Sequence, residues 1–301
     1  MTLAAALEEK KITPETVLTV PYSIKRGGDT FHDHERHPVQ KLTTSGILAV
    51  SSNTGTIKIG EMLSNDTLHD YLSKFGMGKS TGSGLPGEST GILRPVSDWS
   101  GTTAPTVAFG QGYSLTAMQA TSIFATIAND GVRVSPTVIA GTSDASGKFT
   151  ASSARTNERV ISATTAQQLR IMMESVVSGQ GTAPSAAVPG YRVAGKTGTA
   201  MRFNSELRKY SGYTASFIGF APADAPKYVI SVTIQDPKGA YYGGSLGGPV
   251  FKKVMTFVLQ SEHVAPTGTK VMPVALTQKE LTAKKRDDSV VKASQVSARQ
   301  R

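Results

Sequence analysis

Residues 190–200 read Gly190-Tyr-Arg-Val-Ala-Gly195-Lys196-Thr197-Gly198-Thr199-Ala200, and two further apolar segments follow at 213–221 and 227–235. All three segments are rich in β-branched and aromatic side chains, which is typical of β-strands. Pro222-Ala-Asp-Ala-Pro226, between the last two, has the composition of a turn. We therefore predict an antiparallel sheet with strands at Tyr191–Ala200, Tyr213–Ala221 and Lys227–Gln235, the last two forming a hairpin.

Helical periodicity surrounds these strands. Apolar side chains recur at helical spacing in three stretches, which predicts helices that each bury one face. The second stretch follows Ser162, a residue type that caps helices, and the third follows the glycine-rich stretch 239–248. The stripes are Leu115, Met118, Ile123 and Ile127; Leu169, Met172, Met173 and Val176; and Val250, Val254, Phe257 and Val258. The sequence therefore predicts an α+β fold, with helices before and after the strands.

The composition excludes several kinds of chemistry. The 301 residues are 39% hydrophobic and include no cysteine, so disulfides, thiolate zinc sites and thiol catalysis are ruled out. No run of residues approaches the roughly 18 consecutive apolar positions of a membrane-spanning helix. Residues 1–10 also lack the basic start and apolar stretch of a signal peptide.

The charge is concentrated at the C-terminus. The chain carries a net charge of +10, and residues 266–301 hold 8 Lys/Arg against 3 Asp/Glu, which places +5 there. This segment contains no aromatic residue, so it is short of the apolar surface that would offset its ordering entropy. We predict a folded domain at 1–265, a basic and mostly disordered tail at 266–301, and no nucleic-acid partner.

The stretch from Gly190 to Thr197 also spells the phosphate-binding pattern G-x-x-x-x-G-K-T. That motif needs a buried strand before it and a helix after it, and neither is predicted here. In a strand, Lys196, Thr197 and Thr199 instead offer a carboxylate an ammonium and two hydroxyls, while Gly198 lets a ligand approach the backbone. An ordinary surface strand is the alternative.

A second polar group, Ser51-Ser52-Asn53, follows the apolar run Ile47–Val50. A serine hydroxyl can relay a proton, and an asparagine amide can both donate to and accept from a peptide bond. Alone, this group is typical of an ordinary helix end. Together with Lys196-Thr197-Gly198, however, it supplies two of the three motifs shared by penicillin-binding proteins and class A β-lactamases.

The chain resembles the transpeptidase domain of class B penicillin-binding proteins well beyond these motifs. Order and spacing agree over about residues 2–260. The phrases that carry the resemblance are Thr2–Glu9, Gly46–Asn53, Gly84–Ser89, Phe109–Thr116, Gly195–Ala200 and Ser216–Pro222. A β-lactamase or a carboxypeptidase fits these phrases less well. The resemblance implies the penicillin-binding, serine β-lactamase-like fold and a peptidoglycan D,D-transpeptidase activity that needs no metal or organic cofactor.

The resemblance also implies roles for individual residues. Ser51 would relay a proton to the leaving D-Ala, and Asn53 would hold the substrate amide. Lys196 would polarise the site and, with Thr197 and Thr199 beside Gly198, favour the terminal carboxylate. The implied partners are stem peptides ending in D-Ala-D-Ala, β-lactams, and proteins of the division or elongation machinery. The implied location of the intact parent is the outer face of the cytoplasmic membrane.

One motif of the family is missing from its expected place. The family nucleophile is the serine of S-x-x-K, and the only literal match, Ser289–Lys292, lies in the predicted tail. By the resemblance, the serine would lie about five residues before Met1, which predicts that this chain is truncated and catalytically inactive by itself. The alternative is a non-catalytic binding or scaffold module of the same fold.

A polar segment near the N-terminus contains His32, Asp33, His34, Glu35 and His37. Such a group has the side chains of a metal site. It follows Gly27-Gly28 and has no apolar periodicity, so we favour an ordinary surface loop and predict no metal.

Overall fold

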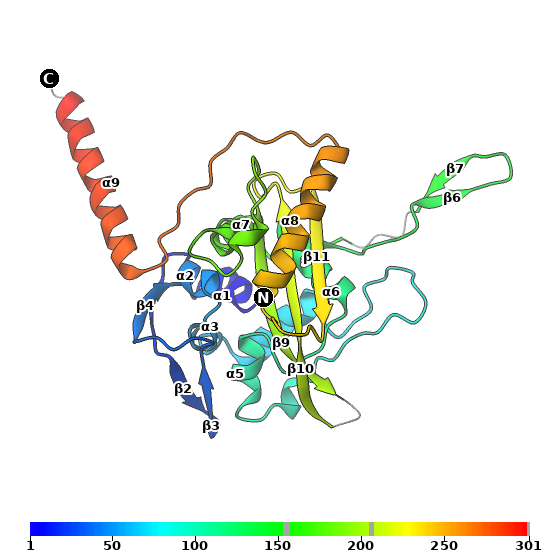
Figure 1. The fold of residues 1–301 in the computed structure, drawn as a ribbon, viewed down its shortest axis with the longest axis horizontal. Helices are drawn as coiled ribbons and strands as arrows, with labels where there is room; N and C mark the ends of the chain where they lie inside the picture. The colour runs from blue at the N-terminus through cyan, green and yellow to red at the C-terminus, as the bar shows by residue number, and fades with distance from the viewer. Residues whose placement is uncertain (153–156, 205–207, 300–301) are drawn as a thin grey trace.

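The computed structural model describes residues 1–152, 157–204 and 208–299, and of residues 203, 204 and 290–299 only the backbone. Figure 1 shows the arrangement of the elements. The helices are α1 (Thr2–Glu8), α2 (Thr44–Ala49), α3 (Asn53–Gly60), α4 (Asn65–Lys74), α5 (Thr103–Ala108), α6 (Ala117–Ala128), α7 (Ala163–Val177), α8 (Gly243–Ser261) and α9 (Gln278–Arg299), with 3-10 turns η1 (Val96–Asp98) and η2 (Pro184–Ala186). The strands are β1 (Val17–Val20), β2 (Ser23–Arg26), β3 (Asp29–His32), β4 (Gln40–Thr43), β5 (Val132–Val134), β6 (Gly141–Ser143), β7 (Phe149–Ala151), β8 (Asn157–Arg159), β9 (Ala194–Asn204), β10 (Lys209–Ala221) and β11 (Tyr228–Gln235).

The largest sheet has the strand order β11-β10-β9 and is antiparallel throughout, which confirms the predicted hairpin and the α+β class. Strand β9 starts at Ala194 rather than Tyr191, because the Tyr191 N–H closes a turn onto the Val188 carbonyl. In the ladder, Lys196 lies opposite Ile218 and Thr197 opposite Phe217. Strand β9 is an edge strand, as β11 is, so one side of its backbone is not paired with another strand of this sheet.

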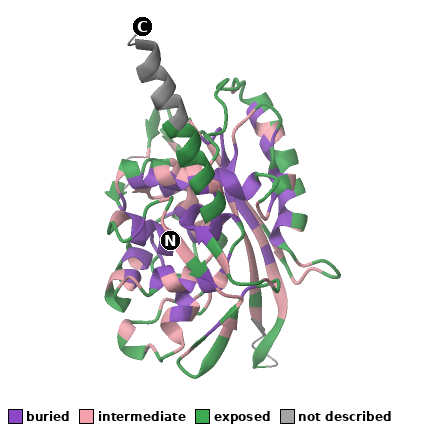
Figure 2. Cartoon of the chain, turned by 90° about the vertical axis from the view of Figure 1, so that its left-hand side faces the viewer, coloured by how far each residue is buried: buried purple, intermediate pink, exposed green. Residues whose placement is uncertain are grey.

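Both faces of this sheet are covered by apolar side chains. Neighbouring residues of a strand point to opposite faces, and Phe217 and Phe220 accordingly reach two different cores. The ring of Phe217 contacts that of Phe251 in α8, with centroids 4.9 Å apart. Phe220 belongs to the larger core, to which α1, α4, α6 and α7 contribute. Figure 2 shows the buried residues gathered along the sheet and the helices that flank it.

Helix α7 confirms its predicted stripe, whereas α6 buries Ile123 and Ile127 of its stripe, leaves Met118 half-buried, and begins only after Leu115. The N-cap residue Thr116 and Gln119 form a reciprocal capping box at the start of α6. Helix α7 begins where the sequence predicts, because the Ser162 hydroxyl accepts a hydrogen bond from the Thr165 N–H. Helix α6 ends at Ala128, and Asp130 and Gly131 then take the left-handed conformation that turns the chain away.

Helix α8 is present, but the predicted packing face was wrong. Val250, Val254 and Phe257 are exposed, and the buried residues are Phe251, Met255, Leu259 and four glycines. The helix begins inside the glycine-rich stretch, at Gly243, because the glycines let it approach the sheet closely. A Cβ on Gly247, for example, would lie 2.9 Å from Cβ of Phe217. The glycine face, which carries no apolar periodicity, therefore makes the contact with the sheet.

The structure also differs from the sequence expectation in the C-terminal segment. Residues 266–301 were expected to be disordered, yet Ala275, Leu276 and Leu281 are buried and helix α9 begins at Gln278. The Thr43 N–H donates to the Leu276 carbonyl at 2.9 Å, which fixes this segment beside β4. A few apolar side chains are therefore enough to anchor a segment whose average composition is polar.

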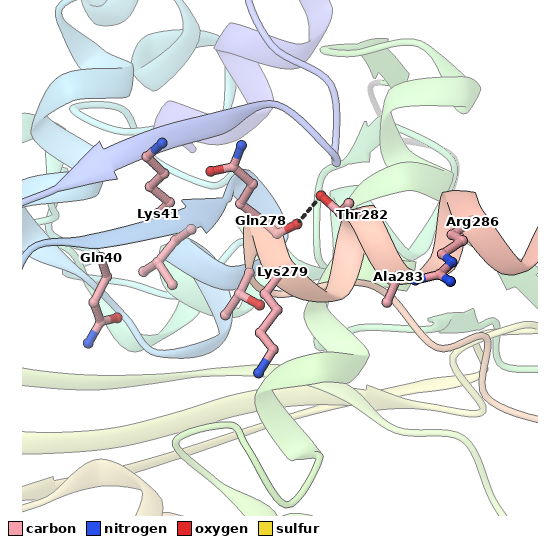
Figure 3. Close-up of a pocket in the computed structure, with 9 residues that line it drawn as sticks. Gln40, Lys41, Gln278, Lys279, Thr282, Ala283 and Arg286 are labelled. Carbon is pink, nitrogen blue, oxygen red and sulfur yellow. Dashed lines mark hydrogen bonds between the residues drawn. The ribbon is translucent and has the colours of Figure 1, made fainter.

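Helix α9 projects away from the rest of the molecule beyond this anchor (Figure 1). A groove of about 740 Å³ lies between its first turns and β4 (Figure 3). Its lining includes the basic residues Lys41, Lys279 and Arg286. Within the described ranges, no helix is both long and apolar enough to cross a membrane.

Candidate active site

Strand β9 places the sequence Lys196-Thr197-Gly198-Thr199 along the edge of the main sheet. The strand continues to Asn204, so these residues form neither a loop nor the start of a helix. A phosphate-binding loop requires both, and the geometry excludes that interpretation of the G-x-x-x-x-G-K-T spelling. Gly195 is required for packing, because a Cβ there would lie 2.4 Å from the ring of Phe217.

Ser51 lies at the corner between two helices. Helix α2 ends at Ala49, and α3 begins at Asn53 with Ser52 as its N-cap. Between them Ser51 has φ +57°, a left-handed conformation that is uncommon for residues other than glycine. Strain of this kind is held by the surrounding structure and is concentrated at functional sites. The corner leaves the side chain of Ser51 exposed, whereas Ser52 is buried.

The fold brings this corner to the edge of β9. The Lys196 ammonium donates a hydrogen bond to the Ser51 hydroxyl at 2.7 Å, across 145 positions of sequence. The same Nζ lies 3.1 Å from the carbonyl oxygen of Thr197. Burial lowers the pKa of Lys196 to about 8, so this group can exchange a proton near neutral pH more readily than an exposed lysine.

The hydroxyls that flank Lys196 are held in place by their neighbours. The hydroxyls of Thr197 and Thr182 share a hydrogen bond of 2.9 Å, and that of Thr199 accepts one from the Gly243 N–H at 3.3 Å. Gly198 is required by the sheet itself, because a Cβ there would lie 2.5 Å from the hydroxyl of Ser216. The edge of β9 therefore presents an ammonium and two oriented hydroxyls, a set suited to a carboxylate.

Asn53 lies at the first position of α3, on the same side as Ser51. Its amide nitrogen donates to the carbonyl of His32 at 3.0 Å. Among the residues that the structure describes, its amide oxygen has no hydrogen-bond donor. That oxygen is therefore available to a peptide N–H, which is the role expected for Asn53 from the sequence.

The sequence missed one residue beside this corner. The segment 32–37 was expected to be an ordinary surface loop; His34 and Glu35 are exposed, but Asp33 is buried and the expectation was wrong for it. Its carboxylate accepts hydrogen bonds from the Ser52 hydroxyl at 2.7 Å and the Thr54 N–H at 2.8 Å. Within the described ranges, no group of three or more His, Cys, Asp or Glu side chains is arranged to hold a metal ion.

A ring cluster connects the two sides of the site. The His34 ring and the Tyr242 hydroxyl are 2.6 Å apart, and Tyr241 stacks on Tyr213 with centroids 4.5 Å apart. Tyr242 immediately precedes Gly243, which binds Thr199. Tyrosine and histidine occur throughout the sequence, so only the three-dimensional structure identifies this cluster.

Met1, the N-cap of helix α1, lies close enough to Lys196 for the charge of the lysine to act on its amino group. Burial, together with the charge of Lys196, lowers the pKa of the Met1 amino group to about 6. The start of α1 therefore points toward the same site as β9 and the Ser51 corner. The literal S-x-x-K at Ser289–Lys292, by contrast, belongs to α9, whose path leads away from the sheet (Figure 1).

Comparisons with known proteins agree with this geometry. The family described as "Penicillin binding protein transpeptidase domain" matches residues 1–256. The penicillin-binding protein PbpB of Mycolicibacterium smegmatis is 42% identical over 274 residues, and the peptidoglycan D,D-transpeptidase FtsI of Escherichia coli is 34% identical over 275. Each alignment covers 88% of this chain, but only 42% and 43% of those proteins. The chain thus spans less than half the length of these relatives.

The structural neighbours lead to the same family. The crystal structure of penicillin-binding protein 3 from Mycobacterium tuberculosis in complex with ampicillin has a TM-score of 0.87 and 40% sequence identity. The structural alignment covers 92% of this chain and 63% of the crystallised chain. A complex of the same protein with aztreonam gives a TM-score of 0.84.

Proposed function

We propose a function from one premise: this chain belongs to the penicillin-binding protein transpeptidase family. The proposed function is peptidoglycan D,D-transpeptidation in cell-wall synthesis, carried out when the site described above is joined to an S-x-x-K segment. Lys196 and Ser51, which lie 145 positions apart in sequence, meet at 2.7 Å, and this observation carries the proposal. This contact supports the proposal that the two groups exchange a proton during the reaction.

In the proposed reaction, the hydroxyl oxygen of the S-x-x-K serine attacks the carbonyl between the two terminal D-Ala residues of a stem peptide. A serine ester forms and the peptide C–N bond breaks, while the proton of the serine hydroxyl passes by way of the S-x-x-K lysine and Ser51 to the nitrogen of the leaving D-Ala. An amine of a second stem peptide then attacks the ester, forming the cross-link and restoring the serine. Lys196 serves this relay by exchanging a proton with the Ser51 hydroxyl.

The edge of β9 is proposed to bind the substrate. Lys196 and the hydroxyls of Thr197 and Thr199 receive the terminal carboxylate, and the amide oxygen of Asn53 accepts from the substrate peptide N–H. The Thr199 backbone N–H, with that of the serine nucleophile, stabilises the developing oxyanion. One such donor contributes roughly 2.7–4 kcal/mol to catalysis. The accessible edge of β9 supports this assignment.

The position of α1 supports a nucleophile supplied through that helix. The Met1 amino group is close enough to Lys196 for the two charges to interact. A residue joined ahead of Met1 would therefore enter the site within the first helical turns. We propose that residues 1–301 alone form no acyl-enzyme.

We propose β-lactams as ligands of the same site, because one relative of this chain, penicillin-binding protein 3 of Mycobacterium tuberculosis, has been crystallised in complex with ampicillin and with aztreonam. The proposed setting is the outer face of the cytoplasmic membrane, where peptidoglycan stem peptides are available. The relatives named FtsI support a role with division proteins. No nucleic-acid partner is proposed.

The test uses an extended chain, defined as residues 1–301 preceded by the S-x-x-K segment of the Mycolicibacterium smegmatis relative. We expect fluorescent penicillin to label this chain covalently and a D-Ala-D-Ala peptide to slow the labelling. The control changes only the serine of S-x-x-K to alanine, which should abolish the label. A folded extended chain that stays unlabelled would contradict the proposed activity and favour a non-catalytic binding module.

A further inference from the structure

Asp33 belongs to none of the motifs that define the site, yet its carboxylate lies directly behind one of them. We propose that Asp33 is a positioning residue that fixes Ser51 and Asn53 for the acylation step. This inference rests on the proposed function, because it assigns a role within the same site.

The contacts of Asp33 account for both carboxylate oxygens. Oδ2 accepts a hydrogen bond from the Ser52 hydroxyl at 2.7 Å, and Oδ1 accepts one from the Thr54 N–H at 2.8 Å. Oδ2 also lies 3.0 Å from Nε2 of His37. Asp33 is 6% exposed, so water cannot readily replace its carboxylate as the hydrogen-bond acceptor of these partners.

Ser52 and Thr54 flank Asn53, and Ser52 directly follows Ser51. Asn53 itself donates to the carbonyl of His32, the residue before Asp33. Three consecutive residues, 52–54, are therefore bound to the segment 32–33. This segment holds the corner between α2 and α3 from outside both helices.

The corner needs such support because Ser51 has a left-handed backbone. A non-glycine residue in this conformation is strained and relaxes when its surroundings allow. Ser51 is bounded by the end of α2 on one side and by Ser52 on the other. Release of Ser52 from Asp33 weakens the second restraint, which then rests on the hydrogen bonds of Ser52 to Ile47 and Gly55, and the Ser51 hydroxyl leaves its position opposite Lys196 more readily.

Asp33 is itself fixed in place. Its N–H donates to the Tyr22 carbonyl at 2.9 Å, and the ring of Tyr22 packs edge-on against that of His37 with centroids 6.0 Å apart. Arg36 lies over the Tyr22 ring at 5.6 Å. The carboxylate therefore acts from a fixed support, which a positioning role requires.

The first experiment uses residues 1–301 and does not depend on acylation. In Asp33→Ala, hydrogen exchange of the Thr54 and Gly55 amides is expected to be at least about 10-fold faster, because their region of α3 loses its anchor. The matched control is Glu174→Ala, which removes another buried carboxylate, the one that binds Arg192. Unchanged exchange at Thr54 in a folded Asp33→Ala protein would overturn the proposal.

The second experiment measures penicillin acylation in the extended chain. Asp33→Ala should lower the acylation rate constant about 10–100-fold, and Asp33→Asn, which keeps one acceptor oxygen, should lower it less. Glu174→Ala should change it less than about 3-fold at the same temperature, although it too lowers thermal stability. A loss equal to that of Asp33→Ala in this control would show that destabilisation alone explains the effect.

A double-mutant cycle separates positioning from general damage. In a Ser51→Ala, Asn53→Ala background, Asp33→Ala should add less than about a 3-fold loss, because the groups it positions are gone. A full 10–100-fold further loss would contradict the proposal. If Asp33→Ala does not fold, Ser52→Ala removes the same hydrogen bond and is expected to act in the same direction. If the unsubstituted extended chain takes no label, the proposed function fails, while the amide exchange still decides whether Asp33 holds the corner.

Discussion

The site has two walls that are built in different ways. We name them for their proposed roles: the binding wall is the edge of β9, and the relay wall is the corner between α2 and α3. Lys196, Thr197 and Thr199 lie on a strand, and the antiparallel ladder with β10 fixes their backbone. Ser51 and Asn53 lie at a corner between two short helices, which is fixed by side chains from distant segments. A ladder repeats along its length, whereas each side-chain contact at the corner stands alone. The relay wall therefore depends on single side chains, and the binding wall depends on backbone pairing and on the close packing at Gly195 and Gly198.

Two separate segments support the relay wall. Asp33 binds the start of α3, and the C-terminal segment binds the start of α2. The Thr43 hydroxyl donates to the Ala275 carbonyl at 2.7 Å and accepts from the Gly46 N–H at 3.0 Å. Residues distant from Ser51 in the sequence therefore hold the two helices that flank it.

The largest expected effect is at Lys196, whose side chain extends from one wall and contacts the other. In the extended chain, Lys196→Ala should lower the penicillin acylation rate about 10²–10⁴-fold, because the proton relay loses its partner. Time courses of fluorescent penicillin labelling measure this rate. The control is Lys58→Ala, a lysine of α3 that binds the Thr19 carbonyl, and it should stay within about 2-fold. An unchanged rate in Lys196→Ala would remove the role assigned to this lysine.

A smaller effect is expected from the support of the relay wall. Thr43→Val keeps the side-chain shape but loses the α2 cap and the contact with Ala275. We expect the free energy of unfolding to fall by about 1–2 kcal/mol, as measured by urea denaturation of residues 1–301. Thr282→Val, in exposed α9, loses a hydroxyl that binds only its own helix and should change stability by less than about 0.5 kcal/mol. Equal losses in both variants would show that the C-terminal segment does not support α2.

A further expected effect is a pH dependence of stability that comes from the titration of Lys196. Burial lowers its pKa from 10.5 to about 8, so between these values the unfolded chain binds more protons than the folded one. Stability should therefore rise with pH over this window, and below about pH 8 the cost of the buried charge is fully present. The free energy of unfolding of the unsubstituted chain should rise relative to that of Lys196→Met from pH 8 to pH 10. A difference that is flat or falls with pH would contradict the lowered pKa.

Much of the binding wall could be predicted from sequence because its information is local. β-Branched and aromatic residues indicate strands, Lys196–Thr199 falls within one of them, and the turn at 222–226 sets the hairpin. The corner was also identified, since Ser51-Ser52-Asn53 follows an apolar helical run. The family resemblance then supplied roles that strand and helix patterns alone do not contain.

The rest depends on contacts that no local pattern encodes. Asp33 lies in a polar segment, and it is buried because it packs against Ser52 and Thr54, which come later in the sequence. Helix α8 buries its glycines because their missing side chains allow close contact with β10, so the apolar stripe indicated the wrong face. The C-terminal anchor consists of three buried apolar side chains in a segment whose average composition is polar: Ala275, Leu276 and Leu281.

The most direct test of the central claim is to locate the penicillin adduct in the extended chain by mass spectrometry of its peptides. We propose that Ser51 and Lys196 act in proton relay and substrate binding, and not in nucleophilic attack. It predicts one adduct per molecule, on the serine of S-x-x-K, and no adduct on residues 1–301 by themselves. An adduct on Ser51, in either chain, would contradict this division of roles between the two walls.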